Sequence, residues 1–315
     1  MLSMGHEHTT PILGWTNVAL GLSFILFDVF VSNIFGLGIG QSMLISAFRC
    51  VLQLGVVAVL LERVFATENP WAVAGIAFLL NLLGTFEIVV NKSTRRHHYM
   101  FPSVLVGLLG STIPISILGS RFAMSVQPFW EPVQYIPVVG MLCGSAISGM
   151  VLTLNYLLRE LQDNRDKVEV YLAFGATRME ACRPIAIEAL KIALTPVINQ
   201  MSVLGIIAIP GMMTGAILGG ASVQQAAKLQ MIIVFMLSSA TCLSAVFTTI
   251  AVVSVTVDSD HRIRMDRVDD RKHGIWRARE RMGKTLMILL KKLVCGWREK
   301  GTDTLSERTP LITGE

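Results

Sequence analysis

The chain has 315 residues, of which 52% are hydrophobic and 16% are charged, and its mean hydropathy is +0.59. Soluble domains are usually about 45–50% apolar and about 25% charged, so the composition predicts an all-α polytopic membrane protein. The net charge is +5, but no basic patch is interleaved with aromatic side chains, which argues against nucleic-acid binding. Five scattered cysteines without a Cys-x-x-Cys pair indicate neither a disulfide framework nor a zinc site.

The apolar runs predict seven membrane spans, each near the ~20 residues that a helix needs to cross a bilayer. They cover residues 15–36, 42–61, 71–90, 104–118, 136–158, 196–218 and 231–257. A polar tail, 1–14, precedes this membrane portion, 15–257, and a basic tail, 258–315, follows it.

Lysine and arginine gather on one side of this arrangement. The loop after the third span holds Lys92, Arg95 and Arg96, and the segment 159–195 between the fifth and sixth spans is also rich in basic residues. The positive-inside rule therefore predicts that the N-terminus lies outside and that the C-terminus lies in the cytosol.

Three ionisable residues fall inside predicted spans: Asp28, Arg49 and Glu87, with Gln53 one turn beyond Arg49. Charges at membrane depth are costly and need an explanation. One interpretation makes these residues the polar lining of a translocation path. The other pairs Arg49 with Asp28 or Glu87 across packed helices, and Glu87, near a helix end, can also reach the interface.

The segment 159–195 alternates in charge, which suits an exposed helix with ion pairs one turn apart. Gly175 interrupts it and predicts a bend or a turn between two helices. Taken alone, this segment is a solvated extension of the fifth span. Because it leads directly into the sixth span, the alternative is a device that couples a soluble partner to the membrane.

The sixth predicted span contains Pro210-Gly211, which predicts a kinked or broken helix. Broken helices are tolerated at membrane depth where they line a cavity. The break is followed by residues that can bind a solute or an ion, Met212, Met213, Thr214 and Gly215. Thioethers suit soft metal ions, but methionine also fills irregular packing interfaces, and both interpretations stay open.

The tail 258–315 carries three further signals. Residues 284–297 predict an amphipathic helix at the inner leaflet. The Gly283-Lys284-Thr285 sequence lacks the first glycine of a phosphate-binding loop, because Ala278 stands there, so no nucleotide site is predicted. An acidic dileucine pattern, formed by Glu307, Leu311 and Ile312, resembles sorting signals for endosomes or vacuoles in eukaryotes.

Two motifs in the middle of the chain carry a family resemblance. The segment 169–175, EVYLAFG, is similar to the EAA loop of ATP-binding cassette (ABC) importer permeases. The runs AFGATR at 173–178 and PGMMTG at 210–215, with Arg49 and Gln53 earlier in the chain, resemble the FetB-type permease family of bacterial iron exporters and plant aluminium-sensitivity proteins. The resemblance covers about residues 40–257, and Ala216 departs from the glutamine that follows PGMMTG in many members.

The resemblance implies an ABC permease subunit that exports iron or a metal-linked solute from the cytosol. It implies that two copies of the permease form the pathway and that a separate ATPase subunit binds ATP, so that this chain itself holds no cofactor. The ATPase would dock on Glu169, Phe174, Gly175, Ala176, Thr177, Arg178 and Arg183. The path would involve residues 210–215 together with Asp28, Arg49, Gln53 and Glu87.

Two other functions remain compatible with the sequence. The chain can be a non-transporting membrane scaffold or regulator whose charged loop binds a partner. It can also be a stand-alone secondary carrier, which would depend on Asp28 and Glu87. An enzyme is not predicted, because no pairing of a nucleophile with a base is visible.

Overall fold

The computed structural model describes residues 14–65, 69–93, 96–97, 99–257 and 268–269. The tail 1–13, the predicted amphipathic helix at 284–297 and the sorting residues Glu307, Leu311 and Ile312 lie outside the described residues. The chain divides into two compact units, Met1–Ala72 and Val73–Glu315.

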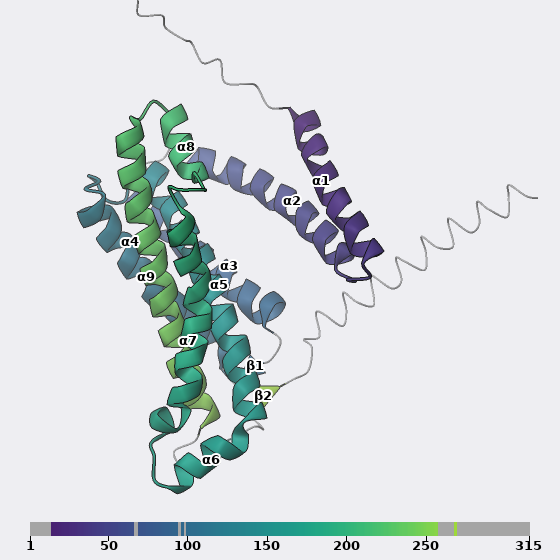
Figure 1. The fold of residues 1–315 in the computed structure, drawn as a ribbon. Helices are drawn as coiled ribbons and strands as arrows, with labels where there is room; N and C mark the ends of the chain where they lie inside the picture. The colour runs from purple at the N-terminus through teal and green to yellow at the C-terminus, as the bar shows by residue number, and fades with distance from the viewer. Residues whose placement is uncertain (1–13, 66–68, 94–95, 98, 258–267, 270–315) are drawn as a thin grey trace, which may run out of the picture. The chain divides into compact units, whose positions relative to one another are not determined.

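The first unit is a helical hairpin of α1 (Trp15–Ile34) and α2 (Gly40–Phe65) (Figure 1). Gly36 and Gly38 in the connecting turn have φ of +61° and +67°, a conformation that favours glycine. Gly40 allows a close approach, because a Cβ there would lie 3.1 Å from Cγ1 of Val29. Ser32 and Gly40 are the buried residues of the two helices, and many large apolar side chains of the hairpin are exposed.

The second unit is built on α5 (Pro132–Asp163) and α9 (Val223–Thr256), which pack along each other. The helices α4 (Met100–Leu118) and α7 (Arg178–Val203) each contact both of them, and α7 lies beside α9 in Figure 1. Leucine, valine and alanine side chains from α4, α5, α6 (Arg165–Ala173), α7 and α9 form one continuous core.

Buried hydroxyl groups link neighbouring helices of this unit. Thr112 Oγ1 of α4 donates a hydrogen bond of 2.7 Å to Asn81 Oδ1 of α3 (Pro70–Phe86). Ser116 Oγ of α4 lies 2.9 Å from the Tyr135 hydroxyl of α5. Small side chains and hydroxyl hydrogen bonds hold helices together where lipid provides no hydrophobic drive.

Two helices change their winding at their C-terminal ends. Helix α3 continues as the π-helix η1 (Glu87–Lys92), and α4 continues as the π-helix η2 (Gly119–Ala123). The two-residue strands β1 (Arg96–His97) and β2 (Val268–Asp269) pair antiparallel, with Arg96 opposite Asp269. The described residues outside this short pairing form helices and their connections, which supports the predicted helical class.

Six of the helices in the described residues are long and apolar enough to cross a membrane. They are Trp15–Ile34, Gly40–Phe65, Pro70–Lys92, Met100–Ala123, Pro132–Asp163 and Val223–Thr256. The sixth predicted span, 196–218, is divided between the end of α7 and α8 (Gly211–Leu218). The predicted break is therefore confirmed, whereas the count of seven spanning helices is not, and the sides on which the termini lie stay predictions.

Candidate functional site

An open cavity of about 520 Å³ lies between α5, α7, α9 and the start of α8. Its volume is within the usual range of about 300–1,000 Å³ for small-molecule sites. The lining residues are Met141, Gly144, Ser145, Ser148, Gly149, Leu152, Ala193, Pro196, Val197, Gln200, Pro210, Gly211, Met212, Gln230, Ile233, Leu237 and Thr241. The cavity therefore lies where the sequence predicts a break.

The break itself follows from local backbone chemistry. Helix α7 ends at Val203, and Gly205 adopts a φ of +85°, which carries the chain out of the helix. Pro210 is extended, has no backbone N–H and precedes the first turn of α8. As a result Pro210, Gly211 and Met212 line the cavity.

The other three residues of the PGMMTG run belong to α8 but are not part of the lining. Met213 is half-buried, whereas Thr214 and Gly215 are exposed. Thr214 Oγ1 donates a hydrogen bond of 3.3 Å back to the carbonyl of Pro210. Their direct contact with a solute stays a prediction.

Several neutral polar groups that the sequence analysis did not single out face the cavity. Ser145 Oγ and Thr241 Oγ1 lie 2.7 Å apart and join α5 to α9. Gln230 Oε1 is buried and has no hydrogen-bond partner among the described residues. Leaving such a group unpaired costs about 1–3 kcal/mol, so a donor from a bound molecule would relieve that cost. An amide directly before the apolar run 231–257 is the sequence signal that could have indicated Gln230.

The lining of the cavity carries no charged side chain. Within the described ranges no group of three or more His, Cys, Asp or Glu residues is arranged to hold a metal ion. Hydroxyl groups, amides and the thioethers of Met141 and Met212 are the functional groups present. Hard cations prefer carboxylate oxygens, so this lining suits a neutral solute with hydrogen-bonding groups or a soft metal.

The ionisable residues of the predicted path lie elsewhere. Asp28 and Gln53 are exposed and Arg49 is half-buried in the first unit. Glu87 begins η1 and accepts a hydrogen bond of 2.6 Å from Asn91 Nδ2. None of these path residues belongs to the cavity lining, and their part in a path stays a prediction.

The predicted turn at Gly175 is confirmed. It connects α6 to α7, and Gly175 has a φ of +88° that disfavours any other residue. Phe174 beside it is 87% exposed, which is unusual for an aromatic side chain at the end of a charged segment. An exposed aromatic group on a defined turn is typical of a protein-binding surface.

A capping box fixes the start of α7 immediately after this turn. Thr177 Oγ1 accepts a hydrogen bond from Glu180 N, and Glu180 Oε2 accepts from Thr177 N at 2.9 Å and from Thr177 Oγ1 at 2.7 Å. These hydrogen bonds from Thr177, side chain first and then backbone, hold the pKa of the Glu180 carboxyl below its ordinary value. The Thr-x-x-Glu spacing is the sequence signal for this cap.

Helix α6 is anchored to the membrane helices by one face. Val168 and Leu172 are buried in the core that also contains Leu157 and Leu161 of α5. The other predicted contact residues surround the turn: Glu169 pairs with Arg165 at 2.6 Å, Ala176 and Arg178 are half-buried, and Arg183 is exposed. The turn is thus a firmly held surface with exposed apolar and charged groups.

Six helices that are long and apolar enough to cross a membrane define a polytopic α-helical membrane protein. The chain belongs to the uncharacterised protein family UPF0014, whose model matches residues 15–256. It is 31% identical over 240 residues to the protein ALUMINUM SENSITIVE 3 of Arabidopsis thaliana, covering 75% of this chain and 85% of that protein. It is 34% identical over 215 residues to the UPF0014 membrane protein STAR2 of Oryza sativa subsp. japonica, covering 68% and 73%.

A bacterial relative confirms the resemblance expected from the sequence motifs. The chain is 25% identical over 247 residues to a protein named probable iron export permease protein FetB of Escherichia coli (strain K12), covering 78% of this chain and 93% of that protein. No solved structure matches the chain significantly.

Proposed function

We propose that the chain is the permease subunit of an ABC-type transporter that moves a metal ion or a metal-linked solute out of the cytosol. The observation that carries this proposal is that a single helix, α7, runs from the exposed turn at Gly175 to the cavity at the break. The names of two relatives, an iron export permease and an aluminium-sensitivity protein, support transport linked to metals.

The turn between α6 and α7 is the proposed docking surface for a separate ATPase. Phe174 is the aromatic anchor, and Tyr171, which is 52% exposed, extends the apolar surface. Arg183 and Arg178 supply charge around it. Interfaces of this kind depend on a few central aromatic and arginine side chains. ATP is assigned to the partner subunit.

The cavity is the proposed solute site. The cavity of a single chain has an uncharged lining, whereas hard cations prefer carboxylate ligands. The lining therefore favours a metal-linked solute over a bare hard cation. Gln230 Oε1 and Ser148 Oγ offer hydrogen bonds, and Met212 offers a soft ligand at the edge of the break. Movement of α7 would shift Pro196 and Gln200 relative to α5 and so alter access to the cavity.

The proposal also includes the assembly and its location. Two copies of the permease form the pathway, with the N-terminus outside and the C-terminus in the cytosol. The basic loops support this orientation. The tail residues Glu307, Leu311 and Ile312 support a vacuolar or endosomal membrane in a eukaryotic cell.

ATP-dependent flux in proteoliposomes tests this function. Vesicles containing the chain, with and without a candidate ABC ATPase, are loaded with iron or other metals in free and chelated form. We expect flux that requires both subunits and ATP, and Phe174→Ala should lower it about tenfold or more, because removing an aromatic anchor costs about 2 kcal/mol. Absence of ATP-dependent flux for every metal species would contradict the transport proposal.

A matched control separates docking from general damage. Phe122 in η2 is also strongly exposed, at 70%, so Phe122→Ala should leave flux unchanged. Gly175→Val should uncouple ATP hydrolysis from flux without removing the protein from the membrane, because its φ of +88° strains a branched residue. Normal flux in both Phe174→Ala and Gly175→Val would show that the turn is not the coupling surface.

A further inference from the structure

The hydroxyl groups that join α5 to α9 at the cavity have already used their hydrogen atoms. A hydroxyl has one hydrogen to donate and two lone pairs that accept. Thr241 Oγ1 lies 2.8 Å from the carbonyl oxygen of Leu237, and a carbonyl only accepts, so Thr241 is the donor there. Ser145 Oγ lies 2.7 Å from Thr241 Oγ1 and must therefore donate to it. Ser145 meets the cavity with lone pairs only.

A second serine of α5 is in the same state. Ser148 follows Ser145 by about one turn and lines the same cavity. Its Oγ donates a hydrogen bond of 3.0 Å to the carbonyl of Gly144, so lone pairs remain. On α9, Gln230 Oε1 is buried and has no hydrogen-bond partner among the described residues. These acceptors, Oγ of Ser145, Oγ of Ser148 and Oε1 of Gln230, are called the acceptor wall below.

The start of α8 brings hydrogen-bond donors to the same cavity. Gly211 and Met212 begin the helix and line the cavity. The first N–H groups of a helix have no acceptor within it, and Pro210 before them provides no side-chain cap. The connection 219–222 reverses the chain between α8 and α9, which contact each other (Figure 1). Gly211 and Gln230 are each about two turns from this connection, so these donors lie level with the unpaired acceptor.

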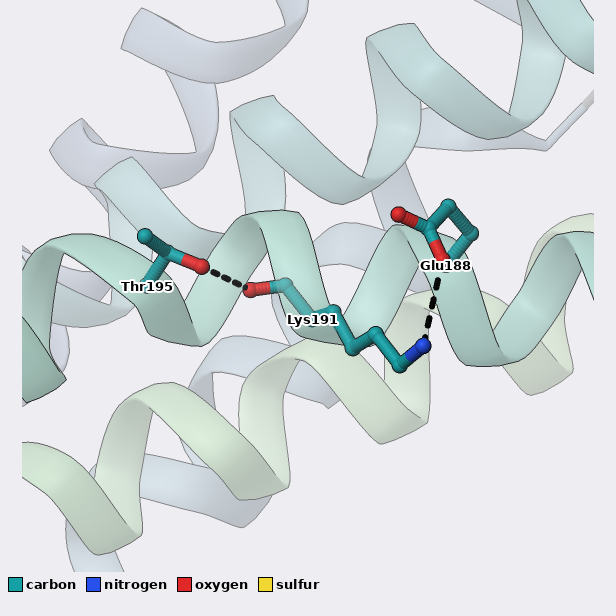
Figure 2. Close-up of polar contacts among 3 residues, drawn as sticks. All are labelled: Glu188, Lys191 and Thr195. Atoms are coloured by element: carbon teal, nitrogen blue, oxygen red, sulfur yellow. Dashed lines mark hydrogen bonds and ion pairs between the residues drawn. The ribbon is translucent and has the colours of Figure 1, made fainter.

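The charged side chains of α7 do not belong to the cavity. Those nearest to the lining in the sequence are Glu188 and Lys191 (Figure 2). Lys191 Nζ lies 3.4 Å from Glu188 Oε2, so the two charges offset each other. Thr195 Oγ1 donates a hydrogen bond of 2.7 Å to the carbonyl of Lys191. These three residues are outside the lining, as is Lys228 of α9, and the lining therefore imposes no charge on a solute.

We infer that the cavity binds an uncharged solute through hydroxyl groups, and that this solute is the neutral hydroxide of a metal or a metalloid. The inference rests on the proposed function and makes its solute specific. A hydroxyl group donates to the acceptor wall and accepts from the N–H groups of α8. Gln230 Oε1 then gains the donor that it lacks. Carboxylates are not needed, because the hydroxide ligands already balance the charge of the metal.

Other metal species match the cavity less well. A bare cation has no hydrogen to donate, and the lining has no carboxylate to balance its charge. An oxyanion without hydrogen only accepts, so it leaves Gln230 Oε1 unpaired in a buried position, which is costly. A soft cation can use the thioethers of Met141 and Met212, but it leaves the acceptor wall without donors. A hydroxyl group is the one of these partners that both donates and accepts.

Germanic acid tests this solute class, because it is a stable hydroxide that is uncharged near neutral pH. The purified full chain, in a detergent without sugar headgroups, is dialysed to equilibrium against radioactive germanic acid. We expect saturable binding. Silicic acid, which has the same arrangement of hydroxyl groups, should compete, whereas Ag⁺ and sulfate should not. Competition by Ag⁺ or sulfate but not by silicic acid would overturn the inference, and competition by glycerol at a lower concentration than silicic acid would replace the hydroxide by an organic polyol.

Two variants of α9 locate the binding in the cavity. Gln230→Leu removes an acceptor and should weaken germanic acid binding about tenfold, the effect of one lost hydrogen bond. Gln224→Leu makes the same change at an exposed residue outside the lining and should leave binding unchanged. Equal binding by both variants would exclude the acceptor wall. The competition measured on the wild type decides the solute class even where a variant does not fold.

The binding assay contains neither ATP nor an ATPase, so its result is independent of transport. ATP-dependent flux of another metal species, with germanic acid not bound, would overturn the hydroxide and leave the proposed permease standing. Saturable binding that depends on Gln230, without ATP-dependent flux of any species, would support the site and contradict the transport proposal. Flux of radioactive germanic acid that requires both subunits and falls in Gln230→Leu would support both.

Discussion

Replacing Gly149 by alanine tests how closely α5 and α9 pack at the cavity. A Cβ at Gly149 would lie 2.5 Å from Cγ2 of Thr241 and 3.5 Å from the carbonyl oxygen of Thr241. Carbon atoms at optimal contact are separated by about 3.5–4.0 Å, so either Thr241 must turn or the helices must separate.

Thr241 is not free to turn. Its Oγ1 donates a hydrogen bond of 2.8 Å to the carbonyl of Leu237 and lies 2.7 Å from Ser145 Oγ. Rotation would forfeit both contacts, at about 0.5–1.5 kcal/mol each. Separation of the helices costs a similar amount, since overpacking a core costs about 1–3 kcal/mol. The clash therefore costs about 1–3 kcal/mol by either route.

Gly144 provides the matched control, because it lies on the same helix and lines the same cavity. A Cβ there meets nothing within 4 Å in the described part of the chain. Alanine is favoured over glycine inside a helix by about 0.5–1 kcal/mol, and this gain is common to both variants. The difference between Gly149→Ala and Gly144→Ala thus reports the clash alone.

The assay is the apparent midpoint of thermal unfolding in one detergent at one heating rate. At roughly 2 °C per kcal/mol for a long chain, Gly149→Ala should unfold about 2–6 °C below Gly144→Ala. Gly144→Ala should unfold at or slightly above the wild-type midpoint. Equal midpoints for the two variants would refute the close contact of α5 and α9 at Thr241.

Two further predictions concern the ends of the proposed coupling path. Thr177→Ala should destabilise the start of α7 by about 1 kcal/mol, seen as faster amide exchange there. The pKa of Glu180 is lowered in the folded state, so its contribution to folding stability is present above the unfolded pKa and disappears as the pH falls through the folded pKa. The wild type should therefore lose its stability advantage over Thr177→Ala below about pH 4.5. An advantage that stays constant with pH would contradict the cap. Gln230→Leu should leave the unfolding midpoint unchanged or higher but lower flux about tenfold, since one ligand hydrogen bond is lost; unchanged flux would exclude Gln230 from the site.

Most of the fold could be predicted from local features of the sequence. Long apolar runs indicated the spanning helices, so the run 136–158 became Pro132–Asp163 and the run 71–90 became Pro70–Lys92. The turn at Gly175 and the break before Gly211 depend on backbone geometry that glycine and proline impose locally. Such features need no knowledge of distant contacts.

The composition of the cavity could not be predicted in the same way. Ser145, Gln200 and Gln230 are far apart in the sequence, and only the packing of α5, α7 and α9 brings them together. The sequence pattern also predicts a charged segment, 159–195, and a separate sixth span, 196–218. In the structure, α7 crosses that boundary as one helix from Arg178 to Val203. Hydropathy alone does not detect a helix whose first half is polar and whose second half is apolar.

The continuity of α7 gives the proposed coupling its physical basis. The helix has 26 residues and is about 39 Å long, so its two ends are the turn and the break. The buried side chains of its inner face are small, Ala181, Cys182, Ala189, Ala193 and Val197. Small side chains let packed helices slide at low cost, as in shear motions. A displacement applied at Phe174 would therefore move the whole helix past α5, and the loop before Pro210 would carry that displacement into the wall of the cavity.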